Sequence, residues 1–315
     1  MWKKEKVIEL INAYIEQDIF PGTNFAVLED QKMSEYVLGN ATLIPEKTPL
    51  ASGKMWDLAS VTKVVGTGTV LINLVFAGKI DLDEKLKTYL PEFSNETLTI
   101  RHLLTHTSGI DPYIKDRNEL GPEALKKAIL NIQVTDDKTF KYTDINFILL
   151  GFMLEEFFGL ELDEIFQSEV FDPWEMKKTT FGPVENAVAT SPNIPVGTVH
   201  DPKARVLGTH CGSAGLFSDL TSLEKFVQAY FSDDSYLQLV RDYSNGSKKR
   251  SLAWDILEKN ENWILHTGYT GTFILMNLKE KKAVIFLSNR VHIKDERAQW
   301  IKDRDRLIEA FIAGF

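Results

Sequence analysis

The chain has 315 residues, of which 43% are hydrophobic and 26% charged, a composition typical of a globular protein with a packed core. Its net charge of −9, without a dense Lys/Arg stripe, argues against a nucleic-acid partner. The single cysteine, Cys211, excludes an intramolecular disulfide, so an oxidising compartment is not implied. Cys211 also lacks an identifiable activating base, which argues against a cysteine nucleophile.

Residues 1–22 predict an amphipathic helix rather than a signal peptide, because glutamates interrupt the apolar run and no small-residue cleavage site follows. The apolar stretch FILLGFMLEEFFGL is broken by Glu155 and Glu156, and no run reaches the length of a membrane span. We therefore expect a cytoplasmic protein without a membrane span. A chain trimmed of an export signal would look much the same.

After this helix, the pattern predicts two strands, TNFAVLED and SEYVLGNAT, joined by a polar turn. A long buried helix is expected next, over residues 61–80. Its GTGTV run matches half of a dinucleotide fingerprint, but the glycines lie inside the helical pattern, so nucleotide binding is not expected. Residues 81–199 are expected to be mostly helical, with helices near residues 100–107, 121–132, 144–158 and 162–170.

The last third of the chain returns to strands, SLAWDILE, WILHTGYTGTFILMNLKE and KKAVIFLSNRV, and closes with an amphipathic helix from about Lys294. The order sheet, helices, sheet predicts an α/β (α+β) fold. We expect residues 1–80 and 200–315 to form an antiparallel sheet flanked by the N- and C-terminal helices. Residues 81–199 would form an inserted helical domain, with an active site in the cleft between the two.

The stretch DLASVTKVVG places Ser60 three residues before Lys63 at the start of the long helix. Ser60 or Asp57 could simply cap that helix. A capping box, however, has Glu or Gln at the third helical position, where this chain has Lys63. A lysine there faces the positive end of the helix dipole. Capping therefore explains the serine but not the lysine.

A catalytic interpretation explains both residues. Side chains three apart on a helix share a face, so Ser60 Oγ and Lys63 Nζ can form a hydrogen bond. Burial and the helix N-terminus are both expected to lower the pKa of Lys63. A neutral amine could then take the hydroxyl proton and make Ser60 a nucleophile. Ser-x-x-Lys is the acylation motif of β-lactamases and penicillin-binding proteins, but a four-residue pattern needs partners.

The first partner lies in FKYTDINFILLG, where Tyr142 and Asp144 precede an apolar helix. Tyr142 could be an aromatic packed at a domain edge, or a phenol that carries a proton to the leaving group. Asp144 could be an N-cap, or it could tie the helical region to Lys63 through a charge-assisted hydrogen bond.

The second partner is WILHTGYTGTFIL, which holds His266, Thr267, Gly268 and Tyr269. A lone strand histidine is usually structural, but glycine weakens a strand interior unless a ligand or another backbone approaches closely. We therefore expect an edge strand that receives the substrate. The backbone N–H groups of Tyr269 and Ser60 would form the oxyanion hole.

Ser-x-x-Lys, Tyr-x-Asp and His-Thr-Gly, in that order, resemble the three motifs of serine β-lactamases and penicillin-binding proteins. The variants resemble the class C-like branch, which also contains esterases, D-aminopeptidases and D,D-carboxypeptidases. Further similar stretches are LTIRHLLTHTSGI, HCGSAGLFSDLTSLEKF and FLSNRVH. The resemblance implies Ser60 as nucleophile, Lys63 as its base and Tyr142 as second proton carrier. His266 would occupy the third-motif position usually held by lysine.

Two departures from the family pattern affect the expected substrate. Asp144 stands where many members have Asn, which commonly helps to hold a substrate amide. His266 in place of Lys would make the charge that recognises a carboxylate depend on pH. Both changes favour esters, or other substrates without an obligatory carboxylate, over efficient β-lactam turnover.

We thus predict a serine hydrolase that forms an acyl-enzyme on Ser60, most simply an esterase or amidase of small-molecule or peptidoglycan-like substrates. The alternatives are a penicillin-binding D,D-carboxypeptidase, a D-aminopeptidase or a weak β-lactamase, and, in another class, a binding or regulatory protein of the same fold. No metal or organic cofactor is expected. His102 and His106 lie four apart on an expected helix, but Leu103 replaces the Glu of a zincin motif.

Overall fold

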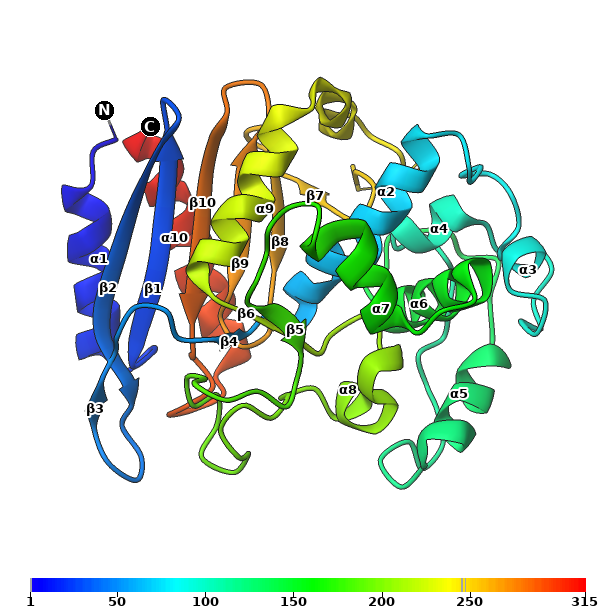
Figure 1. The fold of residues 1–315 in the computed structure, drawn as a ribbon, viewed down its shortest axis with the longest axis horizontal. Helices are drawn as coiled ribbons and strands as arrows, with labels where there is room; N and C mark the ends of the chain where they lie inside the picture. Colours follow the sequence, from blue (N-terminus) through cyan, green and yellow to red (C-terminus); the bar gives the residue numbers. More distant parts are fainter. Residues whose placement is uncertain (1, 245, 247) are drawn as a thin grey trace.

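A seven-stranded antiparallel sheet dominates the computed structural model, which describes residues 2–244, 246 and 248–315 (Figure 1). The strand order is β3-β2-β1-β10-β9-β8-β7. Strands from the two ends of the chain meet at its centre, where Phe25 of β1 pairs with Phe286 of β10. The strands are β1 (Gly22–Glu29), β2 (Lys32–Thr42), β3 (Thr48–Pro49), β7 (Asp255–Ile256), β8 (Trp263–Thr267), β9 (Phe273–Asn277) and β10 (Lys282–Ser288).

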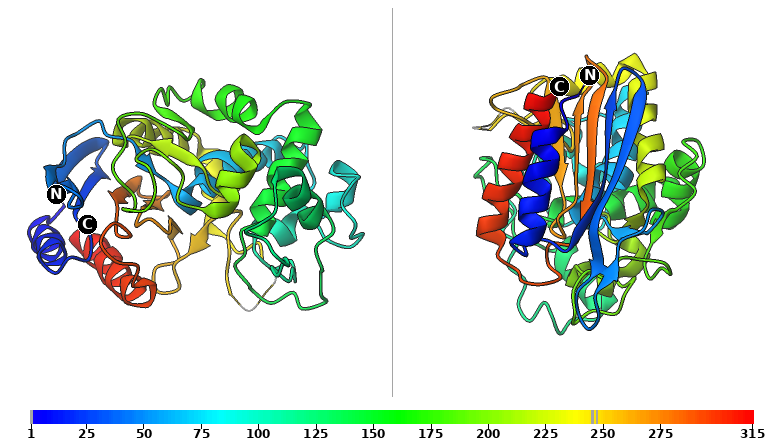
Figure 2. Two further views of the ribbon diagram at one scale, coloured as in Figure 1. Left: turned by 90° about the horizontal axis from the view of Figure 1, so that it is seen from below. Right: turned by 90° about the vertical axis from the view of Figure 1, so that its left-hand side faces the viewer.

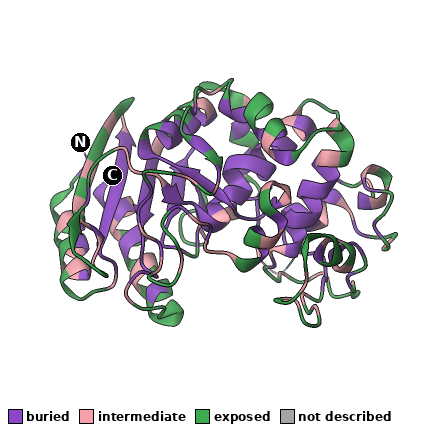
Figure 3. Cartoon of the chain, turned by 60° about the horizontal axis from the view of Figure 1, so that its bottom comes forward, coloured by how far each residue is buried: buried purple, intermediate pink, exposed green. Residues whose placement is uncertain are grey.

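Helices cover both faces of this sheet (Figure 2). The terminal helices α1 (Glu5–Glu16) and α10 (Arg297–Gly314) pack side by side on one face, as expected, and α9 (Leu220–Ser232) covers the other. Alternation along β1 sends Phe25 toward the terminal helices and Ala26 toward the opposite core. The central strands are therefore buried on both faces (Figure 3).

The middle of the chain is helical, as predicted, with shorter helices than the pattern suggested. Its centre is α6, in which every residue from Ile145 to Leu154 is buried. The helix that begins at Leu162 continues as a π turn over residues 167–171. The helices are α3 (Leu86–Tyr89), α4 (Ile100–Leu104), α5 (Pro122–Leu130), α6 (Ile145–Phe158) and α7 (Leu162–Phe166).

Three expectations about elements are wrong. The helix expected over residues 61–80 is a 3-10 turn at Ala59–Val61, a π turn at Val64–Gly68 and then α2 (Thr69–Phe76). The single strand expected over residues 263–280 is two strands, β8 and β9, joined by a tight turn. The last third also contains α8 (Pro202–Leu207) and α9 in addition to strands.

A second, three-stranded sheet has the order β4-β6-β5 and was not anticipated. It joins β4 (Trp56–Asp57), β6 (Leu216–Ser218) and β5 (Thr179–Phe181). Its strand β5 comes from the range expected to be an inserted helical domain, and one hydrophobic cluster contains both Ala26 of β1 and Phe152 of α6. The division of the chain at residues 80/81 and 199/200 therefore stays a prediction.

One segment of the described chain, Ala59–Phe76, is long and apolar enough to cross a membrane. The expectation that no run reaches this length is therefore wrong, because Lys63 and two glycines interrupt the run without lowering its mean hydropathy enough. In the fold, 78% of this segment is buried among the other elements, as in the core helix of a globular protein.

Candidate active site

Ser60 lies in the 3-10 turn that follows β4, and it lines a cleft of about 650 Å³. The preceding Ala59 has a φ of +46°, a left-handed conformation that an alanine keeps only when its surroundings enforce it. Asp57 supplies part of that constraint, because its Oδ1 accepts the Ala59 N–H at 2.8 Å. The other oxygen, Oδ2, accepts the His200 N–H at 2.7 Å. Asp57 therefore fixes the turn that presents Ser60.

Lys63 is fully buried behind Ser60, and all three N–H donors of its ammonium group are used. Nζ donates to Ser60 Oγ at 2.8 Å, to Asp144 Oδ1 at 2.8 Å and to the Ser213 carbonyl oxygen at 3.0 Å. The Ser60–Lys63 contact expected from the three-residue spacing is thus present. The geometry places a hydroxyl and an amine in the position that a nucleophile and its base require.

The expected lowering of the Lys63 pKa is wrong. Burial does act to lower it, but the charge of Asp144 and the side chain of Tyr142 outweigh burial and raise the pKa of Lys63 above its ordinary value. The resting protein therefore holds Lys63 as an ammonium ion around neutral pH.

The π turn after Lys63 depends on close packing at its glycines. A Cβ on Gly66 would meet the Phe166 ring at 2.4 Å, and a Cβ on Gly68 would meet the Lys63 carbonyl oxygen at 2.5 Å. The glycines of the GTGTV run thus serve helix packing at a functional turn and do not form a phosphate loop.

Tyr142 lies at the cleft with 42% of its surface exposed. Its ring centroid is 5.2 Å from Lys63 Nζ and 4.4 Å from the ring centroid of His106. His106 is buried, Asn146 contacts its Nδ1 at 2.8 Å, and burial holds its pKa well below the ordinary value. His106 therefore supports Tyr142 as a neutral ring, a contact that the sequence analysis did not anticipate.

Asp144 stands at the N-cap position of α6 but makes no side-chain capping hydrogen bond. Its carboxylate instead bridges two lysines, with Oδ1 at 2.8 Å from Lys63 Nζ and Oδ2 at 3.1 Å from Lys203 Nζ. Burial opposes its charge, but the two ammonium groups dominate and hold the pKa of Asp144 below its ordinary value. Of the two expectations for Asp144, the tie to Lys63 is confirmed and the helix cap is not. Lys203 was missed.

The turn between β8 and β9 is bound directly to the nucleophile turn. Thr270 Oγ1 donates to the Asp57 carbonyl oxygen at 2.8 Å, and Thr272 Oγ1 donates to that of Leu58 at 3.0 Å. A Cβ on Gly268 would lie 2.6 Å from the Leu58 carbonyl oxygen, so only glycine allows this approach.

Thr267, Gly268 and Tyr269 line the cleft. The expectation of an edge strand here is wrong, because β7 lies beyond β8 in the sheet. Within the described residues, however, β7 pairs with Ile264 and Leu265 alone, so the end of β8 is still open toward the cleft. Within the described residues, the backbone N–H of Tyr269 has no hydrogen-bond partner, which leaves it available to an acyl oxygen.

His266 does not have the expected role. Its side chain is buried against Trp254 and does not line the cleft. Burial, together with the charges of Lys63 and Arg250, holds the pKa of His266 well below its ordinary value. His266 therefore brings no pH-dependent charge to a substrate carboxylate.

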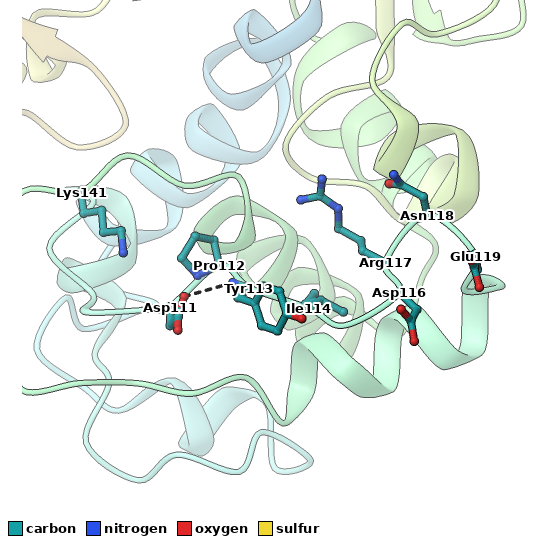
Figure 4. A pocket seen from close by; sticks show the side chains of 9 residues that line it. All are labelled: Asp111, Pro112, Tyr113, Ile114, Asp116, Arg117, Asn118, Glu119 and Lys141. Carbon is teal, nitrogen blue, oxygen red and sulfur yellow. Dashed lines mark hydrogen bonds between the residues drawn. The ribbon is translucent and has the colours of Figure 1, made fainter.

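Arginine side chains line the cleft instead. Arg304 of α10 reaches Thr267 Oγ1 at 3.4 Å, and the guanidinium of Arg290 lies 4.5 Å from the Tyr269 ring centroid. Pro112 and Arg117 also line the cleft, and they border a neighbouring hollow of about 620 Å³ (Figure 4). The cleft is thus more cationic than the net charge of the whole chain suggests.

No group of three or more His, Cys, Asp or Glu side chains within residues 2–244, 246 and 248–315 could hold a metal ion. His102, the first half of the discounted pair, instead contacts Thr99 through Nδ1 at 3.0 Å. The chemistry that this geometry supports is nucleophilic attack by a serine beside a lysine, a tyrosine and a free backbone donor.

Comparison with known proteins agrees with this fold. The Beta-lactamase family model matches residues 7–308, so the chain belongs to this family, and it is a serine hydrolase. A Salmonella gallinarum protein named as a D-alanyl-D-alanine carboxypeptidase is 26% identical, over 90% of this chain and 82% of that protein.

Two solved structures show the same fold. A class C β-lactamase mutant superposes with a TM-score of 0.81 at 18% identity, covering 99% of this chain and 97% of that one. EstCE1, described as a hydrolase with promiscuous acyltransferase activity, superposes with a TM-score of 0.79 at 17% identity, covering 98% and 97% of the two chains.

Proposed function

We propose that the protein is an esterase or amidase that acts through an acyl-enzyme on Ser60. The observation that carries this proposal is the 2.8 Å contact between Lys63 Nζ and Ser60 Oγ, a residue that lines the cleft. A serine and an amine at this separation can exchange a proton without moving far. A substrate in the cleft would reach Ser60 next to the free end of β8.

In the proposed first step, Ser60 Oγ forms a bond to the acyl carbon of the substrate, and the hydroxyl proton passes to the deprotonated form of Lys63. The N–H groups of Tyr269 and Ser60 would stabilise the oxyanion. As the tetrahedral intermediate collapses, the bond to the leaving group breaks and Tyr142 delivers the proton that the leaving group needs. Water then releases the acyl group by the same steps in reverse order.

Because Asp144 keeps Lys63 protonated near neutral pH, only a small fraction of the protein is ready to act as base there. That fraction rises tenfold per pH unit below the pKa of Lys63. We therefore expect the activity to increase steadily into the alkaline range.

A second candidate is a D,D-carboxypeptidase, whose substrates end in a free carboxylate. Arg304, held 3.4 Å from Thr267 Oγ1 beside the open end of β8, favours an anionic group at this position. The relative from Salmonella gallinarum carries that activity in its name. Asp144, an anion beside the nucleophile, favours the ester or amide substrate without such a group.

The test is hydrolysis of p-nitrophenyl esters, with intact-mass detection of a penicillin adduct, by wild type, Ser60→Ala and the exposed-serine control Ser34→Ala. Ester turnover that is lost only in Ser60→Ala, with no persistent adduct, supports the esterase. A persistent adduct on Ser60 supports the peptidase. Activity that survives in Ser60→Ala, or no activity and no adduct in wild type, would refute the proposal.

A further inference from the structure

Lys203 is a second buried lysine at the cleft, and it has no place in the proposed reaction. Its side chain is only 10% exposed, and Nζ lies 3.1 Å from Asp144 Oδ2 and 3.0 Å from Asp201 Oδ2. An ammonium ion loses much of its hydration at such a site and is tolerated because carboxylates surround it. Lys203, like Lys63, therefore depends on the charge of Asp144.

The position of Lys203 is fixed relative to Ser60. Asp201 caps α8 by accepting the Ala204 N–H at 2.9 Å, and it holds Lys203 with its other oxygen. The preceding residue, His200, donates its backbone N–H to Asp57, which also holds the turn of the nucleophile. Lys203 is thus anchored to the same carboxylate that shapes the Ser60 turn.

We propose that Lys203 is a positioning residue, which holds the second carboxylate oxygen of Asp144 and so limits how tightly Asp144 binds the Lys63 ammonium. The four groups form a chain of alternating charge, Lys63, Asp144, Lys203 and Asp201. Without Lys203, the charge of Asp144 acts on Lys63 alone, and a neighbouring like charge is lost as well. Both changes raise the pKa of Lys63 and so reduce the fraction of the protein in which Lys63 is deprotonated and able to act as the base.

Among the groups around Lys63, Asp144 and Lys203 carry the charges that set its protonation near neutral pH. His106 and His266 are both buried and neutral, so they add no charge that varies near neutral pH. Tyr142 also acts on Lys63, and Asp201 also acts on Lys203, whereas Arg117 and Arg205, which line a pocket beside Lys203, keep their charge at every pH tested.

The first test rests on the proposed hydrolase activity. We expect Lys203→Met to lower kcat/KM at pH 7 about tenfold and to displace the pH profile upward by about one unit, since the rising limb changes tenfold per pH unit. The double variant Asp144→Asn/Lys203→Met should recover at least the wild-type rate at pH 7, because the carboxylate that holds Lys63 is gone. Lys203→Arg, which keeps the charge, should stay close to wild type. Lys225→Met, which removes a surface ion pair with Glu175, serves as the control.

A loss in Lys203→Met that is equal at every pH, and that Asp144→Asn does not recover, would refute the proposal and indicate a direct contact of Lys203 with substrate. An unchanged profile in Lys203→Met would also refute it. If Lys203→Met does not fold, the smaller polar variant Lys203→Gln is measured in its place.

The second test does not depend on activity. Urea unfolding of wild type, Lys63→Met, Asp144→Asn and the double variant gives the coupling between Lys63 and Asp144, and the same cycle is repeated with Lys203→Met. The proposal requires a stronger coupling when Lys203 is absent, and an equal or weaker coupling would overturn it. If wild type shows no Ser60-dependent hydrolysis, the proposed function fails while this cycle still decides the role of Lys203.

Discussion

Glu224 is a buried carboxyl group whose removal should stabilise the protein. It lies on α9 with 9% of its surface exposed, and its Oε1 has no hydrogen-bond partner among the described residues. Burial, with the nearby charges of Glu35 and Asp219, raises the pKa of Glu224 from 4.5 to about 7. The folded protein therefore binds this proton more tightly than the unfolded chain does.

The sign and size of the effect follow from this difference. The penalty is absent below pH 4.5, grows as the pH rises and is complete above pH 7, where the folded state must carry the buried charge. At 1.36 kcal/mol per pKa unit, the difference amounts to about 3 kcal/mol. We expect Glu224→Gln, which keeps the shape and removes the charge, to raise the free energy of unfolding by up to about 3 kcal/mol at pH 8 and by about 0 at pH 4.5.

Urea unfolding of wild type and Glu224→Gln at several pH values between 4.5 and 8 measures this difference. Asp57, whose pKa burial raises to about 6, contributes to both proteins and cancels in the comparison. The exposed Glu258→Gln is the matched control and should show no difference at any pH. The reasoning would be refuted if Glu224→Gln had a lower free energy of unfolding than wild type at pH 8, or if the difference between the two proteins were the same at every pH. Either result would show that the folded protein does not penalise the charged carboxylate.

Three further predictions concern the cleft. Asp57→Asn should fold but lose about 100-fold in kcat/KM, because the backbone N–H of Ala59 or of His200 would face the amide NH2 instead of a carboxylate oxygen. Circular dichroism checks the folding and ester kinetics check the activity, and near-normal kinetics would contradict the expected loss. Arg304→Met should lower kcat/KM about tenfold for carboxylate-bearing esters and leave neutral esters unchanged, whereas an equal loss for both would exclude carboxylate recognition. In wild type, the ratio of kcat/KM for carboxylate-bearing esters to kcat/KM for neutral esters should be the same at pH 5.5 and pH 8, because buried His266 stays neutral. A ratio that changes with a midpoint near pH 6.5 would show that His266 does supply the pH-dependent charge.

The arrangement of sheet and helices could be predicted because it depends on local periodicity. The short apolar run within residues 23–30 and the apolar run ending at Ser288 each indicate a strand, and the helical run between them indicates an insertion. The β8–β9 turn was missed because apolar residues flank it on both sides. The signal was present in Gly268 and Gly271, two glycines that only a turn or a close approach explains.

The contact between Ser60 and Lys63 could be predicted because three residues along a helical turn bring their side chains together. The roles of Lys203 and His266 could not. Lys203 meets Asp144 only because α8 begins at a loop fastened to Asp57, and this long-range contact leaves no periodic pattern in the chain. His266 points into the core, and a one-residue difference in strand phase decides between core and cleft.

The pairing of β1 with β10 also has a consequence for how the protein is made. Strand β1 cannot pair with its neighbour β10 until more than 250 further residues have been synthesised, since Thr23 pairs with Ser288. Such long-range contacts slow folding, and they leave β1 with an unpaired edge on any nascent chain that lacks its C-terminal part. The turn that carries Thr270 and Thr272 is also made late. Hydrolysis should therefore begin only when the chain is nearly complete, and partial chains should need protection from aggregation.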